Sequence, residues 1–353
     1  MSNVAASGAE LVDVAVLRCW MDEHSLGEGE LSDLKQLGGG SQNRLIGFRR
    51  GSDEYVLRMP PRHPRPTSNS ALRREATAVA ALAGTDVPVP TVLATCFDEN
   101  VMGGAVFYLM QRVDGINPTV ELSALHRENP TVRREMGLAA VTVLARLAML
   151  DQGSLGLGDL GSPDDFVSRQ VERWNAELES YRALSGYPGP DLPGLDRVAS
   201  WLARHQPDGC KPGIMHGDFH LANLMFRRDS AEVAAVVDWE MVTVGDPLLD
   251  LGWLLATWPD TLNTSMMGEI GAAGALPTRV DLVKRYEQVC GLTLPDMTWH
   301  ATLACFKLGI LLEGTFARAC AGKASLELGK YMRSIAKLLF ARAELFMTSG
   351  IEI

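Results

Sequence analysis

The chain of 353 residues has few cysteines, and none of its six lies close enough to another to form a Cys-x-x-Cys pair. This spacing excludes the common zinc-ribbon and dithiol redox motifs. Several of the cysteines lie among apolar residues, as Cys305 does between Ala304 and Phe306. Scattered thiols in such surroundings indicate reduced core residues of a cytosolic protein. The six are Cys19, Cys96, Cys210, Cys290, Cys305 and Cys320.

The chain also lacks an excess of positive charge and a long apolar run. Its formal net charge is −10 and its pI is near 5.3, which predicts that neither a nucleic acid nor an anionic membrane is a partner. No stretch approaches the roughly 20 apolar residues that cross a bilayer, and residues 1–7 lack the basic start of a secretory signal. We therefore expect a cytoplasmic protein. The composition leaves its oligomeric state open.

The pattern of apolar residues predicts an α+β fold with two lobes. Apolar residues make up 46% of the chain and charged residues 22%, which is an ordinary globular balance. The first part reads as strands at 44–49, 55–58 and 105–110, with helices at 9–25 and 70–83. The rest is mostly helical, over 131–150, 169–184, 198–204, 248–258, 279–290, 300–320 and 326–346. We expect a small lobe with an antiparallel sheet over residues 1–112 and a large helical lobe over residues 113–353.

Two short motifs carry the chemistry. His216-Gly-Asp-Phe-His-Leu-Ala-Asn223 stands between apolar runs, and Asp238-Trp-Glu240 ends the run at 233–237. Two strands meeting in a hairpin would bring Asp218, Asn223 and Asp238 to one mouth. One carboxylate could then receive a hydroxyl proton, while an amide and a second carboxylate hold Mg²⁺ on nucleotide phosphates. Such hard oxygen ligands favour magnesium over zinc.

These motifs resemble a known superfamily. The segment 216–223 is similar to the catalytic loop of the aminoglycoside phosphotransferases and choline kinases, which share the protein-kinase-like fold. Asp238-Trp-Glu corresponds to the metal-binding motif of that fold, and Gly245-Asp-Pro-Leu-Leu-Asp250 to the segment after it. Other segments fall in the family's order, namely 38–43, 55–58, 74–75, 87–90 and 108–111. Residues 155–158 and 168–174 resemble in particular the branch found fused to acyl-CoA dehydrogenases.

The resemblance implies a two-lobed kinase-like fold and a phosphotransferase that uses an alcohol group as acceptor. Residues 1–112 would bind the nucleotide, and residues 113–353 would carry the catalytic loop and the helices that bind substrate. The phosphate donor would be ATP, with GTP as an alternative, and the cofactor Mg²⁺. Asp218 would orient the acceptor hydroxyl, because phosphoryl transfer depends on positioning. Asn223 and Asp238 would be the metal ligands.

Nucleotide binding is assigned to two backbone segments of the small lobe. In the loop 38–43, backbone N–H groups would meet phosphate oxygens, although a triple glycine is also an ordinary loop. The backbone at Met110 and Val113 would receive the base, although both side chains equally suit a core. The residues assigned to the loop are Gly39, Gly40, Ser41 and Asn43.

Arg58 departs from the pattern of the fold. Kinases usually place Lys at this position on the third strand, paired with an acid on the next helix. Arginine keeps the charge and can bind phosphate through two N–H groups, but it is bulkier than lysine. Glu75 would be its partner. The alternative is a surface arginine and a solvated glutamate.

Several neighbours of these motifs have less direct roles. The resemblance makes His216 a brace of the loop, and His220 either contacts substrate or faces solvent. Glu240 could approach a second ion or form a structural hydrogen bond. We expect Asp246 to brace the catalytic loop by accepting backbone N–H bonds, and Asp250 to be structural.

The acceptor is less defined than the reaction. It would be a small molecule with a hydroxyl group, recognised by the helical lobe, where Trp174, Trp253, Trp258 and Trp299 are either core or pocket wall. Three functions compete. The first is an antibiotic-type kinase, the second a metabolic kinase of a hydroxyacyl-type compound, and the third a nucleotide-binding pseudokinase without turnover.

Overall fold

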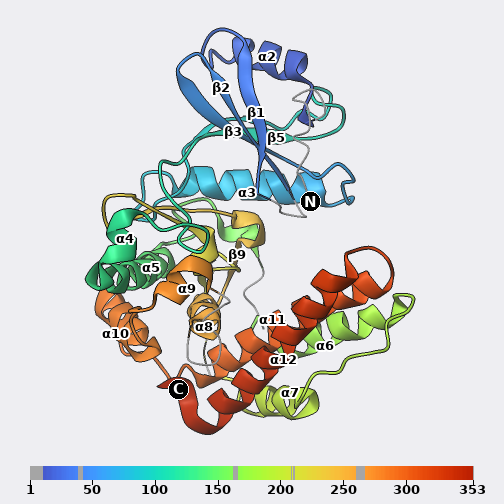
Figure 1. Ribbon diagram of the computed structural model, residues 1–353, viewed down its shortest axis with the longest axis vertical. Coiled ribbons are helices and arrows are strands. Elements are labelled where there is room, and N and C mark those ends of the chain that lie inside the picture. Colours follow the sequence, from blue (N-terminus) through green and yellow to red (C-terminus); the bar gives the residue numbers. More distant parts are fainter. Residues whose placement is uncertain are drawn as a thin grey trace. The chain divides into compact units, whose positions relative to one another are not determined.

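The structure is a computed structural model that describes residues 11–38, 43–161, 166–207, 209, 211–259 and 267–352 (Figure 1). The chain divides into two compact units. The first combines the residues up to Gly115 with Ala234–Val242, and the second combines Ile116–Val233 with Thr243–Ile353. The segment that carries Asp238 therefore belongs to the first unit, although it lies far along the sequence.

The first unit contains a five-stranded antiparallel sheet with the strand order β1-β2-β3-β5-β4. Helices α2 (Val14–Glu23) and α3 (Ser68–Leu82) belong to the same unit (Figure 1). Both lie in regions where the sequence predicts helix. The strands are β1 (Leu31–Leu37), β2 (Arg44–Arg50), β3 (Asp53–Met59), β4 (Val92–Cys96) and β5 (Phe107–Gln111).

Strand β3 carries buried side chains on both faces of the sheet. Tyr55 and Leu57 belong to the core cluster that includes α2, whereas Val56 packs in a second cluster with Leu72 of α3. Successive side chains of a strand point to opposite faces. Arg58 therefore lies on the same face as Val56, toward α3.

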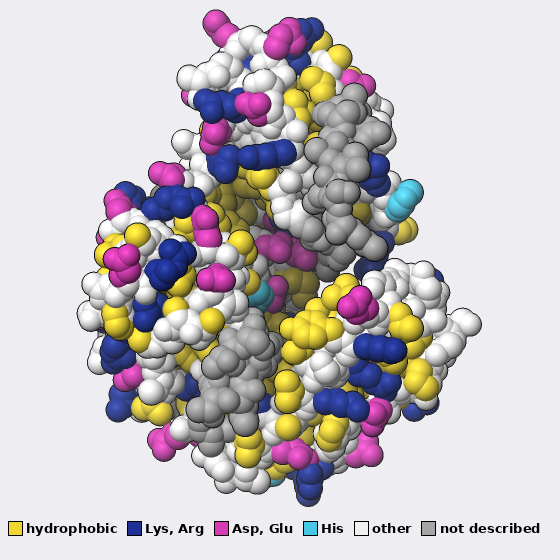
Figure 2. All heavy atoms as spheres, in the orientation of Figure 1, with side chains coloured by type: hydrophobic (Ala, Val, Ile, Leu, Met, Phe, Trp, Pro, Cys, Tyr) yellow, Lys and Arg dark blue, Asp and Glu magenta, His cyan; other side chains and the backbone are white. Residues whose placement is uncertain are grey.

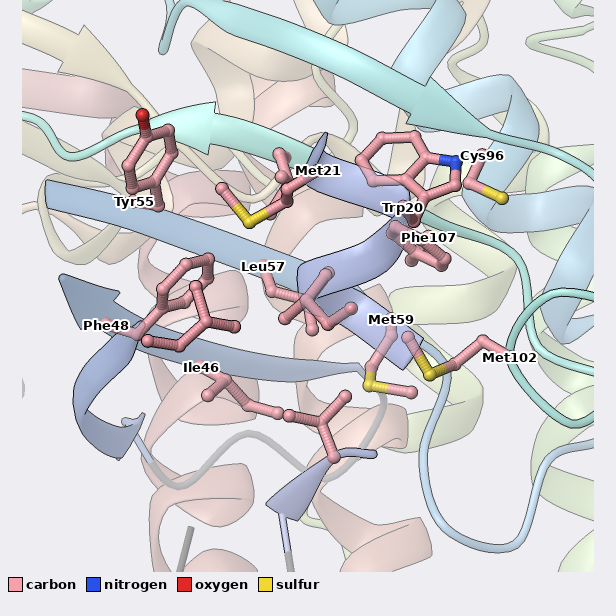
Figure 3. Packing of buried hydrophobic residues seen from close by; sticks show 14 of the residues in the cluster. Trp20, Met21, Ile46, Phe48, Tyr55, Leu57, Met59, Cys96, Met102 and Phe107 are labelled. Carbon is pink, nitrogen blue, oxygen red and sulfur yellow. The ribbon is translucent and has the colours of Figure 1, made fainter. Parts of the chain in front are cut away.

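The α2 side of the sheet is a packed apolar core. Trp20 and Met21 of α2 meet Leu57 and Phe107 of the sheet (Figure 3). The rings of Trp20 and Phe107 are 4.8 Å apart at an interplanar angle of 72°, which is the edge-to-face arrangement that aromatic pairs favour. Each large side chain buried in this way contributes roughly 1.5–3 kcal/mol. This core fixes the position of the sheet that carries Arg58.

The late segment Ala234–Val242 is anchored to the first unit by backbone and side-chain bonds. The N–H of Val236 donates to the carbonyl of Pro88 at 2.8 Å. The indole N–H of Trp239, which is 1% exposed, donates to the carbonyl of Val236 at 2.9 Å. Asp238 between them has φ 66° and ψ 59°, a left-handed conformation that is uncommon outside glycine. The segment contains most of β8 (Val233–Val236) and the 3-10 turn η4 (Trp239–Met241).

The second unit is mainly helical. Short strands β6 (Gly213–Met215) and β9 (Thr243–Gly245) pair antiparallel, and β7 (Leu224–Phe226) follows the 3-10 turn η3 (Leu221–Asn223). Further 3-10 turns are η1 (Gly158–Leu160), η2 (Tyr181–Ala183) and η6 (Gly350–Glu352). The helices are α4 (Ala124–Glu128), α5 (Pro130–Met149), α6 (Gln170–Ser180), α7 (Leu195–Arg204), α8 (Leu248–Thr257), α9 (Gly268–Ala273), α10 (Arg279–Cys290), α11 (Thr298–Cys320) and α12 (Leu326–Ser349).

Helices α8 and α11 contact the loop 216–223, and α12 packs against α11. Helices α11 and α12 lie side by side as a hairpin of two helices (Figure 1). Helix α8 approaches α11 closely at Gly252, where an added Cβ would lie 2.6 Å from the backbone of His300. Glycine at this position therefore lets the two backbones come near each other.

Charged side chains of both signs lie on the visible surface (Figure 2), and the described cysteines are not paired in disulfides. Figure 2 shows Lys and Arg side chains interspersed with Asp and Glu side chains on the visible face. In the part of the chain that the structure describes, no helix has the length and apolar character that a membrane crossing requires. The described cysteines are free thiols. Cys96 and Cys305 are buried, as expected of core residues, whereas Cys19 is exposed and Cys290 and Cys320 are half-buried, so the expectation of core thiols is wrong for these three. Cys210 lies outside the described residues.

The predicted α+β fold is confirmed, and the long helices lie where the apolar pattern predicts them. Helix α5 occupies 130–149 and α11 occupies 298–320, within two residues of the predicted ranges. Helix α4, helix α9 and strand β4 are not predicted. Each is only five or six residues long, which is too short to show a period.

Candidate active site

The loop 216–223 of the second unit, which the sequence predicts to be catalytic, holds Asp218 and Asn223 against each other. Gly217, with φ 85°, makes the turn after β6 that only glycine adopts easily. The amide nitrogen of Asn223 donates to the backbone carbonyl of Asp218 at 2.9 Å and to its carboxylate at 3.1 Å. Because the amide is planar, the oxygen of Asn223 points away from Asp218. The spacing of five residues thus places the amide group of Asn223 beside the carboxylate of Asp218, with the amide nitrogen toward it.

His220 contacts the same carboxylate from within the loop. Its Nδ1 accepts the N–H of Ala222 at 3.2 Å, so in the neutral imidazole the proton is on Nε2. Nε2 lies 3.3 Å from Oδ1 of Asp218. Burial opposes the ionised form of Asp218, but the hydrogen bond from His220 and the charge of nearby groups, including Lys307, outweigh it. The pKa of Asp218 is therefore below its ordinary value.

The peptide before Asp218 is fixed by Asp250 of α8. Its two carboxylate oxygens accept the N–H groups of His216 at 2.6 Å and of Gly217 at 2.9 Å. Burial raises the pKa of Asp250 to about 7, although the two backbone bonds lower it. His216, which is fully buried, accepts the N–H of Asp218 through Nδ1 at 3.3 Å. This is the bracing role that the resemblance implies for His216.

The assignment of the loop brace to Asp246 is wrong, because Asp250 fills that role. Asp246 instead accepts the N–H of Leu248 at 3.0 Å, at the start of α8, and lies 3.1 Å from Nε2 of His300. Asp246 stands before the first helical residue, where a carboxylate caps free N–H groups. Asp250 stands inside the first turn, and its side chain points to the loop.

Lys307 of α11 is a member of the site that the sequence reasoning missed. Its ammonium donates to the carbonyl of Gly217 at 3.1 Å. It also lies 4.3 Å from the ring centre of Trp253 and 5.5 Å from that of Trp174. Burial lowers the pKa of Lys307 below its ordinary value, although the charges of Asp218 and Asp250 oppose this shift. The sequence contains one indication of a special role: Lys307 is the one charged residue in the apolar run 299–312.

A cavity of about 420 Å³ opens beside Asp218 within the second unit. Its described walls come mostly from α8, α11 and α12 and are mainly apolar. Trp253 is 4% exposed, and its indole N–H has no acceptor among the described residues. A pocket of this size suits part or all of a small organic molecule. The described lining residues are Asp218, His220, Ala222, Trp253, Thr257, Met267, Leu308, Leu312, Tyr331, Met332 and Ile335.

The other three tryptophans are core residues and not pocket walls, which is one of the two alternatives that the sequence left open. Trp174, Trp258 and Trp299 are 5%, 2% and 4% exposed. The indole N–H of Trp258 donates to the carbonyl of Pro277 at 2.8 Å, and that of Trp299 to Leu202 at 2.9 Å. Among the four, Trp253 is the one that lines the described cavity.

In the first unit, Arg58 pairs with two acids. Its Nε lies 2.7 Å from Glu75 of α3, and its Nη2 lies 2.7 Å from Asp238. Arg58 and Glu75 are 4% and 1% exposed, so the surface alternative is wrong. Burial disfavours the guanidinium charge, but the carboxylates of Glu75 and Asp238 raise the pKa of Arg58 above its ordinary value. The hydroxyl of Tyr108 also donates to Glu75, at 3.1 Å.

Asn43 and Glu240 extend this cluster. The amide of Asn43 donates to Glu240 at 3.3 Å and to Glu75 at 3.4 Å, and Glu240 lies 3.7 Å from Nη2 of Arg58. The cluster therefore contains one cation and several acids. Of the other residues assigned to the phosphate loop, Gly39, Gly40 and Ser41 lie outside the described residues.

The segment assigned to the nucleotide base has mixed surroundings. Met110 is 8% exposed and packs in the core cluster with Val56 and Leu72. In the sheet it stands opposite Val56. Val113 follows the end of β5 and is half-buried. The side chain of Met110 is thus a core residue, and a role for the backbone at 110–113 stays a prediction.

The chemistry of the donor groups fits magnesium. Asn223 presents an amide oxygen turned away from Asp218, and the side chain of Asp238 is 39% exposed. Both are hard oxygen donors, which Mg²⁺ prefers. Across the described ranges, no three His, Cys, Asp or Glu side chains cluster as a metal site. This is expected for Mg²⁺, which usually takes one or two protein ligands and completes its shell with phosphates and water.

The fold and this loop are those of the protein-kinase-like phosphotransferases. The chain belongs to the phosphotransferase enzyme family, whose sequence pattern matches residues 33–283. A putative aminoglycoside phosphotransferase from Ralstonia eutropha is similar in structure, with a TM-score of 0.75 and 30% identity, over 94% of this chain and 98% of that chain. An aminoglycoside phosphotransferase mutant in complex with ADP and hygromycin B has a TM-score of 0.55 and 16% identity, over 92% and 97% of the chains. This second likeness shows the fold alone.

The curated relatives are longer proteins, and this chain matches a part of each. Acyl-CoA dehydrogenase family member 11 of Gallus gallus is 32% identical over 307 residues, or 85% of this chain and 38% of the relative. Acyl-CoA dehydrogenase family member 10 of Mus musculus is 31% identical over 332 residues, or 91% of this chain and 30% of the relative. The chain thus spans less than two fifths of these relatives. The predicted likeness to the branch fused to acyl-CoA dehydrogenases is confirmed.

Proposed function

We propose that this chain is a kinase that transfers the γ-phosphate of ATP, or of GTP, to a hydroxyl group of a small molecule. The observation that carries the proposal is the pair Asp218 and Asn223. Asp218 is an ionised carboxylate beside a cavity, and Asn223 is fixed to it by two hydrogen bonds. A carboxylate that meets the acceptor and an oxygen ligand that meets the metal are the groups that phosphoryl transfer requires.

Asp218 acts by orienting the acceptor hydroxyl. Its low pKa makes it a weak base near neutral pH, so it accepts a hydrogen bond from the hydroxyl and takes the proton late in the transfer. The hydrogen bond with His220 and the brace by Asp250 hold its carboxylate in one place. Positioning of this kind supplies much of the rate in reactions that need little covalent help.

Asn223 and Asp238 are the residues we assign to Mg²⁺. When bound, the ion would offset the charge that develops on the phosphate oxygens. Asn223 offers its amide oxygen because its nitrogen is engaged with Asp218. Asp238 is paired with Arg58, and its exposed side chain can exchange this partner for a cation.

We propose that the nucleotide phosphates bind to Arg58, which Glu75 holds in place. The loop residues Gly39, Gly40, Ser41 and Asn43 would bind them as well. The backbone at Met110 and Val113 would receive the base. Residues 1–112 would then serve nucleotide binding, and residues 113–353 catalysis and acceptor binding. The location of Asp238 in the first unit adds one late segment to the nucleotide-binding part.

A metabolic kinase of a hydroxyacyl-type compound is the second candidate. The mainly apolar walls of the cavity beside Asp218 favour it, and so does the likeness to proteins named for acyl-CoA dehydrogenases. An acceptor with a hydrocarbon body would bury that body against these walls. An antibiotic-type acceptor would instead need acidic groups around its amines.

The test is a screen of nucleotide consumption with Mg²⁺ over aminoglycosides, amino alcohols, sugars and hydroxyacyl thioesters. We expect phosphate transfer to at least one of them, and a loss of roughly 10²–10⁴-fold in kcat for Asp218→Asn. Asp191→Asn, an exposed acid paired with Lys337, is the matched control and should keep full activity. Undiminished activity of Asp218→Asn would refute the mechanism. Nucleotide binding without transfer to any acceptor would identify a pseudokinase.

A further inference from the structure

We propose that Lys307 determines the specificity of the acceptor cavity. It places a fixed positive charge next to the cavity wall, and thereby selects uncharged or anionic hydroxyl compounds with an apolar body over compounds that carry amines. The proposal rests on the proposed kinase function and names the class of its acceptor.

The position of Lys307 connects it to the cavity through two neighbours. Its ammonium lies 4.3 Å from the ring centre of Trp253, and Trp253 lines the cavity. The next residue along α11, Leu308, also lines the cavity, as does Leu312 one turn further. The charge therefore stands at the edge of the acceptor space, with the indole as their common neighbour.

The charge is fixed in place. The ammonium donates to the carbonyl of Gly217 at 3.1 Å, and Gly217 is the residue before Asp218. An ammonium over an indole ring is also held by the electrostatic attraction between a cation and the ring face. A second cation stands nearby, because the guanidinium of Arg173 lies 5.2 Å from the ring centre of Trp174. Lys307 is 5.5 Å from the same ring.

The described cavity walls offer an amine no free acidic partner. Asp218 is the one acid among the described lining residues, and it is engaged with His220 and Asn223. An ammonium group entering this space would lose its hydration without gaining an ion pair. It would also be repelled by Lys307.

An apolar chain meets the opposite conditions. The walls formed by Met267, Leu308, Leu312 and Ile335 would take a hydrocarbon body out of water. The indole N–H of Trp253, which has no acceptor among the described residues, could donate to a carbonyl or carboxylate oxygen. Compounds with a hydroxyl group, a hydrocarbon body and an acceptor oxygen suit this cavity.

The experiment compares three acceptors of one chain length, namely hexanol, aminohexanol and hydroxyhexanoate. The measured quantity is kcat/KM with saturating ATP and Mg²⁺, in wild type, Lys307→Met, Lys307→Gln and Lys307→Arg. We expect wild type to prefer hexanol and hydroxyhexanoate to aminohexanol by about tenfold or more. This preference should fall about tenfold in the Met and Gln variants and persist in the Arg variant. Lys337→Met, which removes an exposed lysine of α12, should behave as wild type.

The preference is a ratio within one variant, so a general loss of activity cancels from it. Lys307→Gln also retains a side chain that can donate to Gly217, which protects the loop if Lys307→Met folds poorly. An unchanged ratio in the neutral variants would overturn the inference and leave the kinase function intact. Transfer to compounds of the wider screen but to none of these three would also overturn it. No transfer to any acceptor would refute the proposed function, and this inference with it.

Discussion

Replacing Arg58 by methionine separates the structural role of this residue from its role in nucleotide binding. The change removes a guanidinium that pairs with Glu75 and Asp238 at 2.7 Å each. Glu75, at 1% exposed, would then be a buried carboxylate without its cation. Breaking a buried pair from one side costs about 3–5 kcal/mol of unfolding free energy. Asp238 adds little to this cost, because its side chain is 39% exposed and can be hydrated.

The double variant Arg58→Met with Glu75→Met is the matched control. Replacing both partners of a buried pair by apolar residues is often neutral, so we expect most of the lost stability to return. Nucleotide affinity should not return, since the phosphate contact is still missing. The assays are denaturant unfolding and titration with ATP and Mg²⁺. Equal destabilisation of the single and double variants would refute the buried-charge argument, and unchanged ATP affinity in both would refute the phosphate role.

The single variant also has an expected pH dependence. Burial raises the pKa of Glu75 even beside Arg58, whose charge opposes the shift, so this pKa should rise further when Arg58 is removed. The stability of Arg58→Met relative to wild type should therefore be highest at acid pH. It should decrease as the pH rises from the native pKa of Glu75 in wild type through its higher native pKa in the variant, because only the variant still binds the proton in that window. A difference in stability that does not change with pH would contradict this.

Two further changes test the catalytic loop. Asp250→Asn should cost about 1–3 kcal/mol of stability and lower kcat, because an amide cannot accept both backbone N–H groups of the loop; calorimetry and steady-state kinetics measure the two effects, and wild-type values of both would show that Asp250 is not the brace. His220→Phe should raise the pKa of Asp218. When the pH is lowered, kcat of this variant should therefore begin to fall at a higher pH than kcat of wild type. If the two profiles of kcat against pH have the same acid limb, His220 does not act on Asp218.

The pair Asp218 and Asn223 could be found from the sequence because it is local. Five residues separate the two side chains, and a short loop between apolar runs must bring them together. Arg58 and Glu75 were also within reach, because a strand followed by the next helix of a kinase-like lobe places them together. In both cases a short stretch of chain determines the contact.

The contacts of Lys307 and Asp250 with the loop depend on packing between segments that are distant in the sequence. The sequence therefore indicated less about the roles of these two residues. Lys307 reaches Gly217 only because α11 lies against the loop, and no spacing within 299–312 shows this. Asp246 and Asp250 occur in one short motif and look equally suited to brace the loop. Which of them turns toward it is decided by the rotation of α8 after Pro247. Strand β3 was recognised, but its burial on both faces hides the alternation that would have shown where Arg58 points.

The late segment Ala234–Val242 means that the first unit is not a continuous piece of chain. A fragment that ends at Gly115 would contain the whole five-stranded sheet, yet it would lack the N–H of Val236 that meets Pro88 and the carboxylate that meets Arg58. Exchange of this unit between related proteins by a single crossover near residue 115 would therefore combine an arginine from one parent with its aspartate from the other. Such a chimera would have a complete cluster only if the transferred sheet and the retained segment 234–242 still fit each other.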